Sequence, residues 1–309
     1  MNVVALAGGV GGARLADGLA QVLPPEALTI VVNTADDFEW YGLHISPDLD
    51  TVMYTLAGVA NPTTGWGLAG ESFQALEMLG RYGQEIWFHV GDRDLATHVL
   101  RTHWLREGMT LTAVTEALAR ALGVQVTILP MSDACVATVV ETDEGELPFQ
   151  EYFVRRAWQP VVRRIRFEGI GAARPTFAVM ATLRSADAVI VCPSNPFVSI
   201  GPILALPGVR EALRDAPRVV AVSPIVGGQA LKGPAAKMMA ELGQPVSPLS
   251  IARGYGDFLS GFVLDWADQA EAERIAALGI RPLVTDVVMR DQADRARLAR
   301  EVLEMVERL

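Results

Sequence analysis

The sequence predicts an α/β protein with a Rossmann-like, doubly wound and mostly parallel sheet that carries a mixed α+β insertion. Three observations support this fold class. The chain opens with an apolar run, a glycine-rich turn, a helical pattern and a second apolar run, the order of a β-α-β unit. Strand and helix patterns alternate again from residue 175 to the end. With 309 residues, 50% of them hydrophobic, the chain can bury both faces of such a sheet.

The opening unit is the most regular part of the sequence. Residues 3–7 form a wholly apolar run, typical of a strand that is buried on both faces. A helical pattern over residues 13–23 stops at Pro24 and Pro25, because proline cannot continue a helix. Residues 28–32 then predict a second strand, parallel to the first.

The middle of the chain does not alternate in this way. Residues 34–70 have mixed polarity, and we expect one helix in them, near residues 51–58. Two more helices are predicted at residues 94–106 and 110–122. Four strand patterns follow without helices between them, at residues 124–129, 135–141, 147–154 and 161–167.

The last third returns to α/β alternation. Helices are predicted up to residue 185, at 209–215, at 234–242 and after 291, and strands at 188–192 and 218–222. We therefore expect a single α/β domain over residues 1–309. Its core comes from about residues 1–44 and 175–309, and the insertion from about residues 45–174.

Charge and composition exclude several classes of partner. The formal net charge of −10 gives no long-range attraction to nucleic acid or to an anionic membrane. The start lacks the charged segment of a signal peptide, and no apolar run approaches the roughly 20 residues of a spanning helix. We expect a cytoplasmic protein whose two cysteines, Cys135 and Cys192, are buried, reduced thiols.

A cluster of glycines joins the first strand to the first helix. Gly8, Gly9, Gly11 and Gly12 lack side chains, so a ligand can approach the backbone amides, and the start of a helix favours an anion. Their spacing matches neither a dinucleotide fingerprint nor a P-loop. The pattern predicts a phosphate site, and the alternative is a tight turn without a ligand.

Acidic residues follow the second strand. Asn33, Asp36 and Asp37 come directly after it, and Asp48 and Asp50 lie a few residues further on. Loops after the ends of parallel strands line the ligand crevice of such a fold. These carboxylates are therefore candidates to hold Mg²⁺ against a diphosphate or to orient a hydroxyl group. Alternatively, Asp48 and Asp50 cap a helix.

A charged turn precedes the helix at residues 94–106. Arg93 is a candidate to bind phosphate oxygens, with Asp92 or Asp94 holding Arg93 or a metal ion. Asp94 and His98 are one helical turn apart, as metal ligands often are. The alternative is a capping aspartate with a histidine on the surface.

Two loops in the last third offer further phosphate contacts. Ser194 and Asn195 follow the strand at residues 188–192 and can bind a phosphate or a base edge. Lys232 precedes a helix and is either a phosphate ligand or a solvated surface lysine.

Together these stretches resemble the 2-phospho-L-lactate transferase family of the CofD type, nearly from end to end. The order and spacing of the stretches carry the resemblance more than any one of them does. They are GGVGG at 8–12, VNTADD at 32–37, SPDLDT at 46–51, GDRD at 91–94, LPMSD at 129–133, GI at 169–170, PSNP at 193–196, SIGP at 199–202, AVSPI at 221–225 and GPAAK at 233–237.

The resemblance implies an Mg²⁺-dependent homodimeric enzyme of coenzyme F-420 biosynthesis. Such an enzyme moves a 2-phospholactyl or phosphoenolpyruvyl group from a guanosine diphosphate donor to the ribityl hydroxyl of the deazaflavin Fo, and releases GMP. The family places Fo near the positions of Asp50 and His89, the second of which is often basic, and we add Asp92.

The remaining roles are assigned on the same basis. Asp50 orients the hydroxyl and accepts its proton, and Arg93 stabilises the developing charge. Metal ligands are expected among Asp36, Asp37 and Asp48. Phosphate and guanosine contacts are expected from Gly8, Gly9, Gly11, Gly12, Asn33, Ser194 and Asn195.

Two other functions are compatible with the opening unit. A related regulatory family, the gluconeogenesis factors, shares the glycine-rich start but senses a nucleotide sugar; residues 46–51 together with 91–94 favour the enzyme instead. An NAD-dependent oxidoreductase is disfavoured because no acidic residue follows a proper dinucleotide fingerprint. The sequence leaves the donated acid open among lactyl, enolpyruvyl and glyceryl.

Overall fold

A seven-stranded sheet forms the centre of the computed structural model, which describes residues 1–309. The strand order is β14-β13-β10-β9-β1-β2-β5, and every neighbouring pair is parallel. The predicted doubly wound α/β class is confirmed. The strands are β1 Val3–Ala7, β2 Leu28–Val32, β5 Thr127–Pro130, β9 Ala188–Val191, β10 Val219–Val222, β13 Gly261–Asp265 and β14 Arg281–Thr285.

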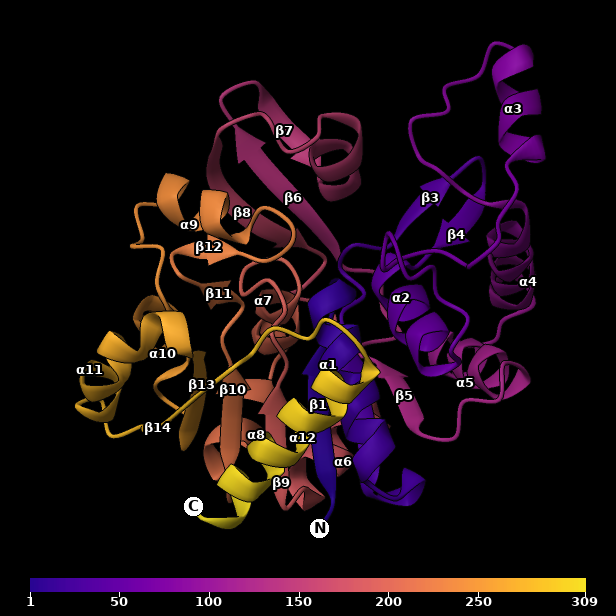
Figure 1. The fold of residues 1–309 in the computed structure, drawn as a ribbon. Coiled ribbons are helices and arrows are strands. Elements are labelled where there is room, and N and C mark those ends of the chain that lie inside the picture. Colours follow the sequence, from indigo (N-terminus) through magenta and orange to yellow (C-terminus); the bar gives the residue numbers. More distant parts are fainter.

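Helices cover both faces of this sheet (Figure 1). One face packs against α1 (Gly9–Val22), α2 (Pro47–Leu56), α5 (Leu111–Ala121) and α12 (Gln292–Glu307). The other face packs mainly against α6 Phe177–Ser185, α7 Ile200–Ala205, α8 Val209–Asp215, α10 Pro248–Tyr255 and α11 Ala272–Ala276. Successive side chains of each strand enter the two cores alternately, which is why the strands read as unbroken apolar runs.

The chain changes direction across the sheet between β1 and β9. From β1 it proceeds to β2 and β5 on one side, and later from β9 to β10, β13 and β14 on the other. The loops that follow β1 and β9 therefore diverge at this point, where such folds form their ligand crevice. These loops contact each other, because the Gly8 amide donates a hydrogen bond of 3.1 Å to Ser194 Oγ.

Two smaller assemblies stand above the carboxyl ends of the strands on opposite sides (Figure 1). One is an antiparallel sheet of three strands, and the other is a hairpin accompanied by two helices. The first comprises β6 Ala137–Thr142, β7 Gly145–Pro148 and β8 Val162–Glu168, and the second β3 Phe38–Trp40, β4 Leu43–Ile45, α3 Gln74–Arg81 and α4 Asp92–Arg106.

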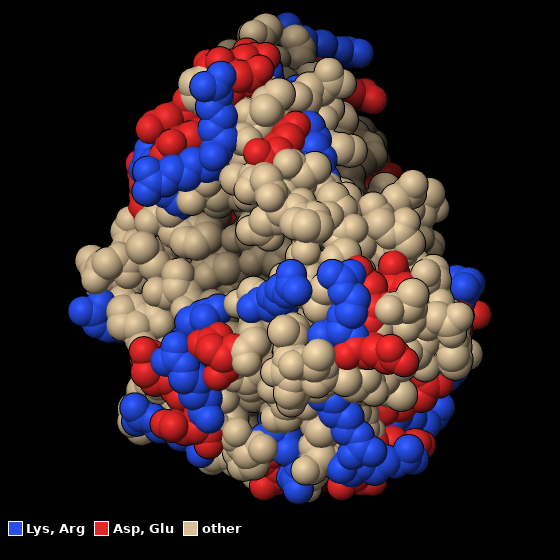
Figure 2. All heavy atoms as spheres, turned by 90° about the vertical axis from the view of Figure 1, so that its left-hand side faces the viewer, with Lys and Arg blue, Asp and Glu red and all other residues tan.

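The remaining elements are short. They are the helical turns Pro25–Ala27, Glu151–Arg155 and Trp266–Glu271, the strands β11 Ile225–Val226 and β12 Gln229–Ala230, and α9 Ala235–Glu241. None of the helices combines the length and the apolarity that crossing a bilayer requires. On the face shown in Figure 2, acidic and basic side chains are interleaved around a hollow of uncharged residues.

Several predicted boundaries need correction. The glycine turn is helical, since α1 starts at Gly9, and the helix expected near residues 51–58 starts at Pro47. The strand expected at residues 147–154 ends at Pro148 and gives way to a helical turn. Residues 127–130 form β5 of the central sheet, although they lie within the range 45–174 expected for the insertion.

The cysteines are a further partial correction. Both are free, as expected, and Cys192 is buried at the end of β9. Cys135 is exposed, because it lies in the turn before β6 rather than within that strand.

Candidate active site

A cleft of about 660 Å³ lies at the topological switch point. It is lined by the start of α1, by α2, by the loops after β9 and β10, and by aromatic side chains from both upper assemblies. A second cavity, of about 420 Å³, lies between α7, α8 and α10, and its lining contains no carboxylate. The first cleft collects the chemistry-bearing residues, so we treat it as the candidate active site.

The glycines allow three segments to meet at the start of α1. A Cβ atom on Gly8 would lie 2.5 Å from Asp48 Oδ2, and one on Gly11 would clash with the carbonyl oxygen of Pro193. Gly9 has a φ of +61°, which an L side chain rarely adopts. Gly8, Gly9 and Gly11 line the cleft.

Gly12 has a different role from the other three glycines. It does not line the cleft, and a Cβ atom there would clash with Ser194 Oγ. For Gly12, the alternative of a tight turn without a ligand therefore holds. Its missing side chain lets α1 pack closely against the loop after β9.

The carboxylate of Asp48 accepts a hydrogen bond from the first backbone amide of α1. The Gly9 amide donates a hydrogen bond of 2.7 Å to Asp48 Oδ1, and Asn33 Nδ2 donates one of 3.0 Å to Oδ2. Burial raises the pKa of Asp48 to about 6, although these two hydrogen bonds act to lower it. A phosphate at this helix start therefore meets a carboxylate first, which a proton or a cation must neutralise.

Asp36 is the second carboxylate on this side of the cleft. It is buried, and its one hydrogen bond from a side-chain hydroxyl comes from Thr138 at 3.2 Å. Burial and the charges of Asp48 and Asp37 hold the pKa of Asp36 well above its usual range. No Lys, Arg or His pairs with Asp36 or Asp48, so any negative charge on this side lacks a compensating cation of the chain.

Asp37 differs from these two carboxylates in its partners and in its position. It accepts hydrogen bonds from Ser46 Oγ at 2.7 Å and from His44 Nε2 at 3.1 Å, and it does not line the cleft. Burial raises its pKa, while His44 and Ser46 oppose the shift. Of the three predicted metal ligands, the structure brings Asp36 and Asp48 to the cleft but not Asp37.

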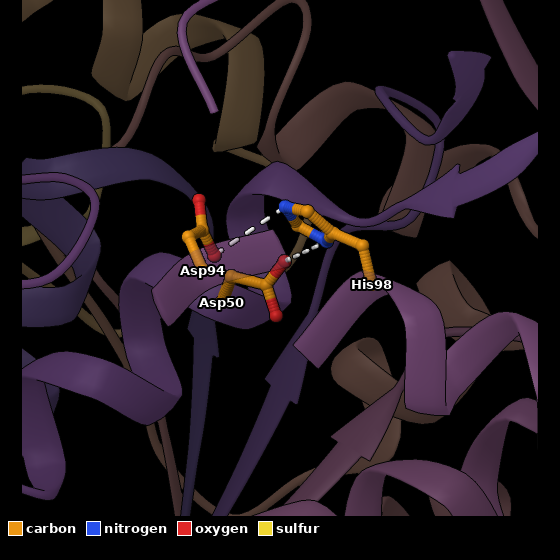
Figure 3. A group of neighbouring side chains, drawn as sticks. All are labelled: Asp50, Asp94 and His98. Carbon is orange, nitrogen blue, oxygen red and sulfur yellow. Dashed lines mark ion pairs between the residues drawn. The ribbon is translucent and has the colours of Figure 1, made fainter. Parts of the chain in front are cut away.

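Asp50 lies in a buried cluster on α2 and α4. Arg101 donates to both of its carboxylate oxygens, with Nη1 3.1 Å from Oδ2. His98 lies between two carboxylates, with Nδ1 3.7 Å from Asp50 Oδ2 and Nε2 3.3 Å from Asp94 Oδ1 (Figure 3). Tyr54 donates a hydrogen bond of 2.7 Å to Asp94.

The ligand atoms of Asp50, Asp94 and His98 lie within 4.8 Å of one another, as in a metal site. However, Arg101 Nη1 is 3.2 Å from His98 Nδ1 and can only donate, so Nδ1 accepts and Nε2 carries the proton. Arg101 also neutralises Asp50. The cluster already contains its cation and holds Asp50 in one orientation.

Asp94 remains ionised in this cluster. Burial acts to raise its pKa, but hydrogen bonds from His98 and from the Tyr54 hydroxyl, together with the charge of Arg101, bring the pKa below its ordinary value. The predicted surface position of His98 is wrong, since its side chain is 2% exposed.

The sequence of this chain matches a known protein family along nearly its whole length. The family model described as 2-phospho-L-lactate transferase CofD matches residues 3–304. The chain belongs to the CofD family. It is therefore a transferase, as the resemblance implied.

Relatives from bacteria and archaea match the chain along nearly its whole length. A phosphoenolpyruvate transferase from Streptomyces griseus is 44% identical, covering 99% of each chain. A 2-phospho-L-lactate transferase from Methanosarcina mazei is 39% identical, covering 98% of this chain and 99% of its own. A solved UPF0052-family protein from Bacillus halodurans shares the fold at a TM-score of 0.62 and 16% identity, covering 98% of both chains.

Of the site residues predicted in the turn at 89–94, only some lie at the cleft in this CofD-family structure. His89 lines the cleft, whereas Asp92 and Arg93 do not. Asp92 accepts hydrogen bonds from Ser72 Oγ at 2.6 Å and from amides at the start of α3, and these bonds lower its pKa. Arg93 donates to the Ala69 carbonyl at 3.1 Å.

The residues predicted to contact phosphate and guanosine also fall into two groups, those that line the cleft and those that do not. Ser194 and Asn195 line the cleft, and Asn195 Oδ1 fixes its own loop by accepting from the Phe197 amide at 2.9 Å. Asn33 is buried outside the lining and donates to Asp48 and to the Val198 carbonyl. Asn33 therefore positions Asp48.

Sequence reasoning missed Arg101, Tyr54 and Arg14. Arg101 follows Asp94 and His98 at positions i+7 and i+3 on one helix, so the face they share was visible in the sequence. Tyr54 likewise follows Asp50 by four residues on α2. Arg14 follows Val10 by one turn of α1, and both line the cleft.

Proposed function

We propose that this chain transfers a 2-phospholactyl or phosphoenolpyruvyl group from a guanosine diphosphate donor to the ribityl hydroxyl of the deazaflavin Fo. This is a step of coenzyme F-420 biosynthesis. The names of the relatives support the two acid groups. The observation that carries the proposal is that one cleft is lined both by the glycine-rich helix start and by Asp50. A diphosphate and an alcohol therefore have room to meet in the same space.

The reaction is an in-line displacement at phosphorus. The ribityl oxygen attacks the phosphorus that carries the acid group, a new P–O bond forms and the bridging P–O bond breaks. GMP leaves with the electron pair of that bond and needs little protonation. The hydroxyl proton passes to a carboxylate, for which we propose Asp50, since it lines the cleft.

Arg101 makes Asp50 primarily an orienting group. Both Asp50 oxygens accept from the guanidinium, so the carboxylate is fixed before the substrate arrives. His98 is a poor alternative base, because its Nδ1 already accepts from Arg101. Trp66, Phe88 and His89 line the same cleft and offer flat surfaces to a tricyclic ring.

The site suits Mg²⁺ at Asp36 and Asp48. Mg²⁺ is usually bound through one or two carboxylates together with substrate phosphates. Asp36 and Asp48 are buried, close enough for one charge to raise the pKa of the other, and without a cationic partner. When bound, the ion neutralises charge that develops on the phosphates. Asp50 is less suitable, because Arg101 already neutralises it.

The test is analysis of products by mass spectrometry. Purified protein receives Fo and Mg²⁺ with the lactyl, enolpyruvyl or glyceryl diphosphoguanosine donor in turn. We expect GMP and an Fo phosphodiester from at least one donor, and the preferred acid identifies the substrate. Tight binding of a uridine sugar, with no product from any donor, would instead support the regulatory alternative.

We further propose that the chain acts as a cytoplasmic homodimer. Light scattering coupled to size-exclusion chromatography tests the oligomeric state, and a mass near twice 33.2 kDa is expected.

A further inference from the structure

Two cations face the candidate active site without an acidic partner. Among the 38 residues that line the cleft, Arg14 and Lys232 are the only arginine and lysine. Neither forms an ion pair, whereas the acidic Asp50 of the same cleft is paired with Arg101. In a chain with a net charge of −10, two unpaired cations in a cleft call for a ligand.

Arg14 extends from the first turns of α1. Its Nη1 donates a hydrogen bond of 3.0 Å to the carbonyl of Met289, which leaves the other guanidinium donors available. Burial and the neighbouring charge of Arg295 lower its pKa. Val10, one turn earlier, lines the same cleft, so Arg14 continues the helix face that begins at the glycines.

Lys232 approaches the same place from the loop before α9. Its Nζ donates a hydrogen bond of 2.9 Å to the Thr64 carbonyl. A Cβ atom on Gly65 would lie 2.7 Å from Val10 Cγ1 and 3.2 Å from Lys232 Nζ, so this loop lies over the start of α1. Burial and then the charge of Arg14 lower the pKa of Lys232, which indicates mutual repulsion.

We propose that Arg14 and Lys232 form an anion clamp that holds the diphosphate of the donor beside the start of α1. The assignment rests on the proposed transferase function for the identity of the donor, but the clamp itself is an anion site. A guanidinium binds two phosphate oxygens at once, and an ammonium adds a mobile point charge. The clamp takes the place that the sequence assigned to Arg93.

The clamp also explains how a phosphate tolerates Asp48. Because Asp48 already accepts the hydrogen bond of the first backbone amide of α1, the helix start alone offers an anion little attraction. Arg14 and Lys232 supply positive charge on the α1 side of the cleft, and they are placed to stabilise the charge that accumulates on GMP as the bridging bond breaks.

The test is titration calorimetry with inorganic pyrophosphate and with GDP at fixed Mg²⁺. We expect Arg14→Met and Lys232→Met each to weaken both ligands at least about tenfold, as for the loss of a charged hydrogen bond. Arg106→Met is the matched control, because Arg106 also donates to a carbonyl, that of Gly42 at 2.8 Å, but does not line the cleft. Unchanged affinity in both clamp variants would overturn the proposal.

Thermal unfolding separates a ligand site from a structural role. Without an anion, Lys232→Met should leave the Tm nearly unchanged, because the lost hydrogen bond is offset by relief of repulsion with Arg14. At the same concentration, pyrophosphate should raise the Tm of the wild type and of Arg106→Met clearly more than that of Lys232→Met. Arg14→Lys, which keeps the charge but not the bidentate geometry, should bind pyrophosphate more tightly than Arg14→Met and less tightly than the wild type. A large fall in Tm with undiminished affinity would contradict the clamp.

The clamp and the proposed function fail in different ways. If the variants lose pyrophosphate but the wild type makes no Fo product with any donor, the clamp stands and the function falls. If the wild type makes product and the variants keep both their affinity and their KM for the donor, the function stands and the clamp falls.

Discussion

Asp48 and Asp50 are two residues apart on the first turn of α2, yet their surroundings are opposite. Asp50 is neutralised by Arg101, which reaches it from α4. Asp48 has only neutral donors, the Gly9 amide and Asn33, and it lies near the equally unpaired Asp36. The comparison teaches that charge left uncompensated by the fold marks where a cation from outside is needed, and that compensated charge marks a fixed orienting group.

The largest expected effect comes from removing the compensation of Asp50. Arg101→Met leaves a buried carboxylate without its partner, and we expect a loss of about 3–5 kcal/mol in the free energy of unfolding. Denaturant titration measures it. Arg120→Met is the control, because its pair with Glu116 is exposed and should contribute about 0–1 kcal/mol. Equal effects of the two substitutions would contradict the assignment of Arg101.

Removing the charge of Asp50 tests its role in the reaction. Asp50→Asn keeps the shape of the side chain but weakens the orientation of the hydroxyl and removes the proton acceptor. We expect turnover with Fo to fall by about 10²–10⁴-fold. The control is Asp92→Asn, because Asp92 lies outside the cleft and accepts only from Ser72 and from amides at the start of α3, so turnover with Fo should stay nearly unchanged. Wild-type turnover in Asp50→Asn would refute the proposed function of this carboxylate.

The buried carboxylates without a cationic partner should make the free energy of unfolding depend on pH. The pKa of Asp48 is near 6 in the folded chain and about 4 when unfolded, so the folded state binds the proton more tightly. This stabilisation is present below pH 4 and is lost as the pH rises through 6. We expect the free energy of unfolding to fall over this window by up to a few kcal/mol.

Asp48→Asn and Mg²⁺ distinguish the origin of that dependence. Asp48→Asn should make the slope between pH 4 and 6 shallower without abolishing it, because burial also raises the pKa values of Asp36 and Asp37. A purely structural effect would shift the whole curve and leave the slope unchanged. Mg²⁺ should stabilise the wild type above pH 6, where Asp48 is ionised, and have less effect on the variant. A slope that is identical in the two proteins would show that Asp48 is not the titrating group.

The sequence predicted the sheet far better than the charge partners. Strands such as β1 are fully buried, so their apolar runs are unambiguous, and the order of the patterns implied the Rossmann-like core. Asp36, Asp48 and Asp50 line one cleft, because they follow β2 or begin α2 at that edge, and His89 reaches the cleft from the loop before α4.

The partners of these residues depend on contacts between segments that are distant in the chain. Arg101 meets Asp50 across 51 residues, and the Asp48 carboxylate meets Gly9 across 39 residues. No local pattern encodes such meetings. Arg93 looked like a phosphate ligand because a charged turn enters a helix there, but the helix start is turned toward Glu71, whose side chain accepts the Arg93 amide at 2.9 Å.

The smallest expected effect is that of Arg93. Its guanidinium donates to the Ala69 carbonyl and lies outside the cleft, so Arg93→Gln should change the KM for the donor less than about twofold and the stability by less than about 0.5 kcal/mol. Lys232→Met, measured in the same assay, should raise that KM at least about tenfold. A reversal of these two effects would return the phosphate contact to α4 and remove the distinction drawn here between the two sides of the cleft.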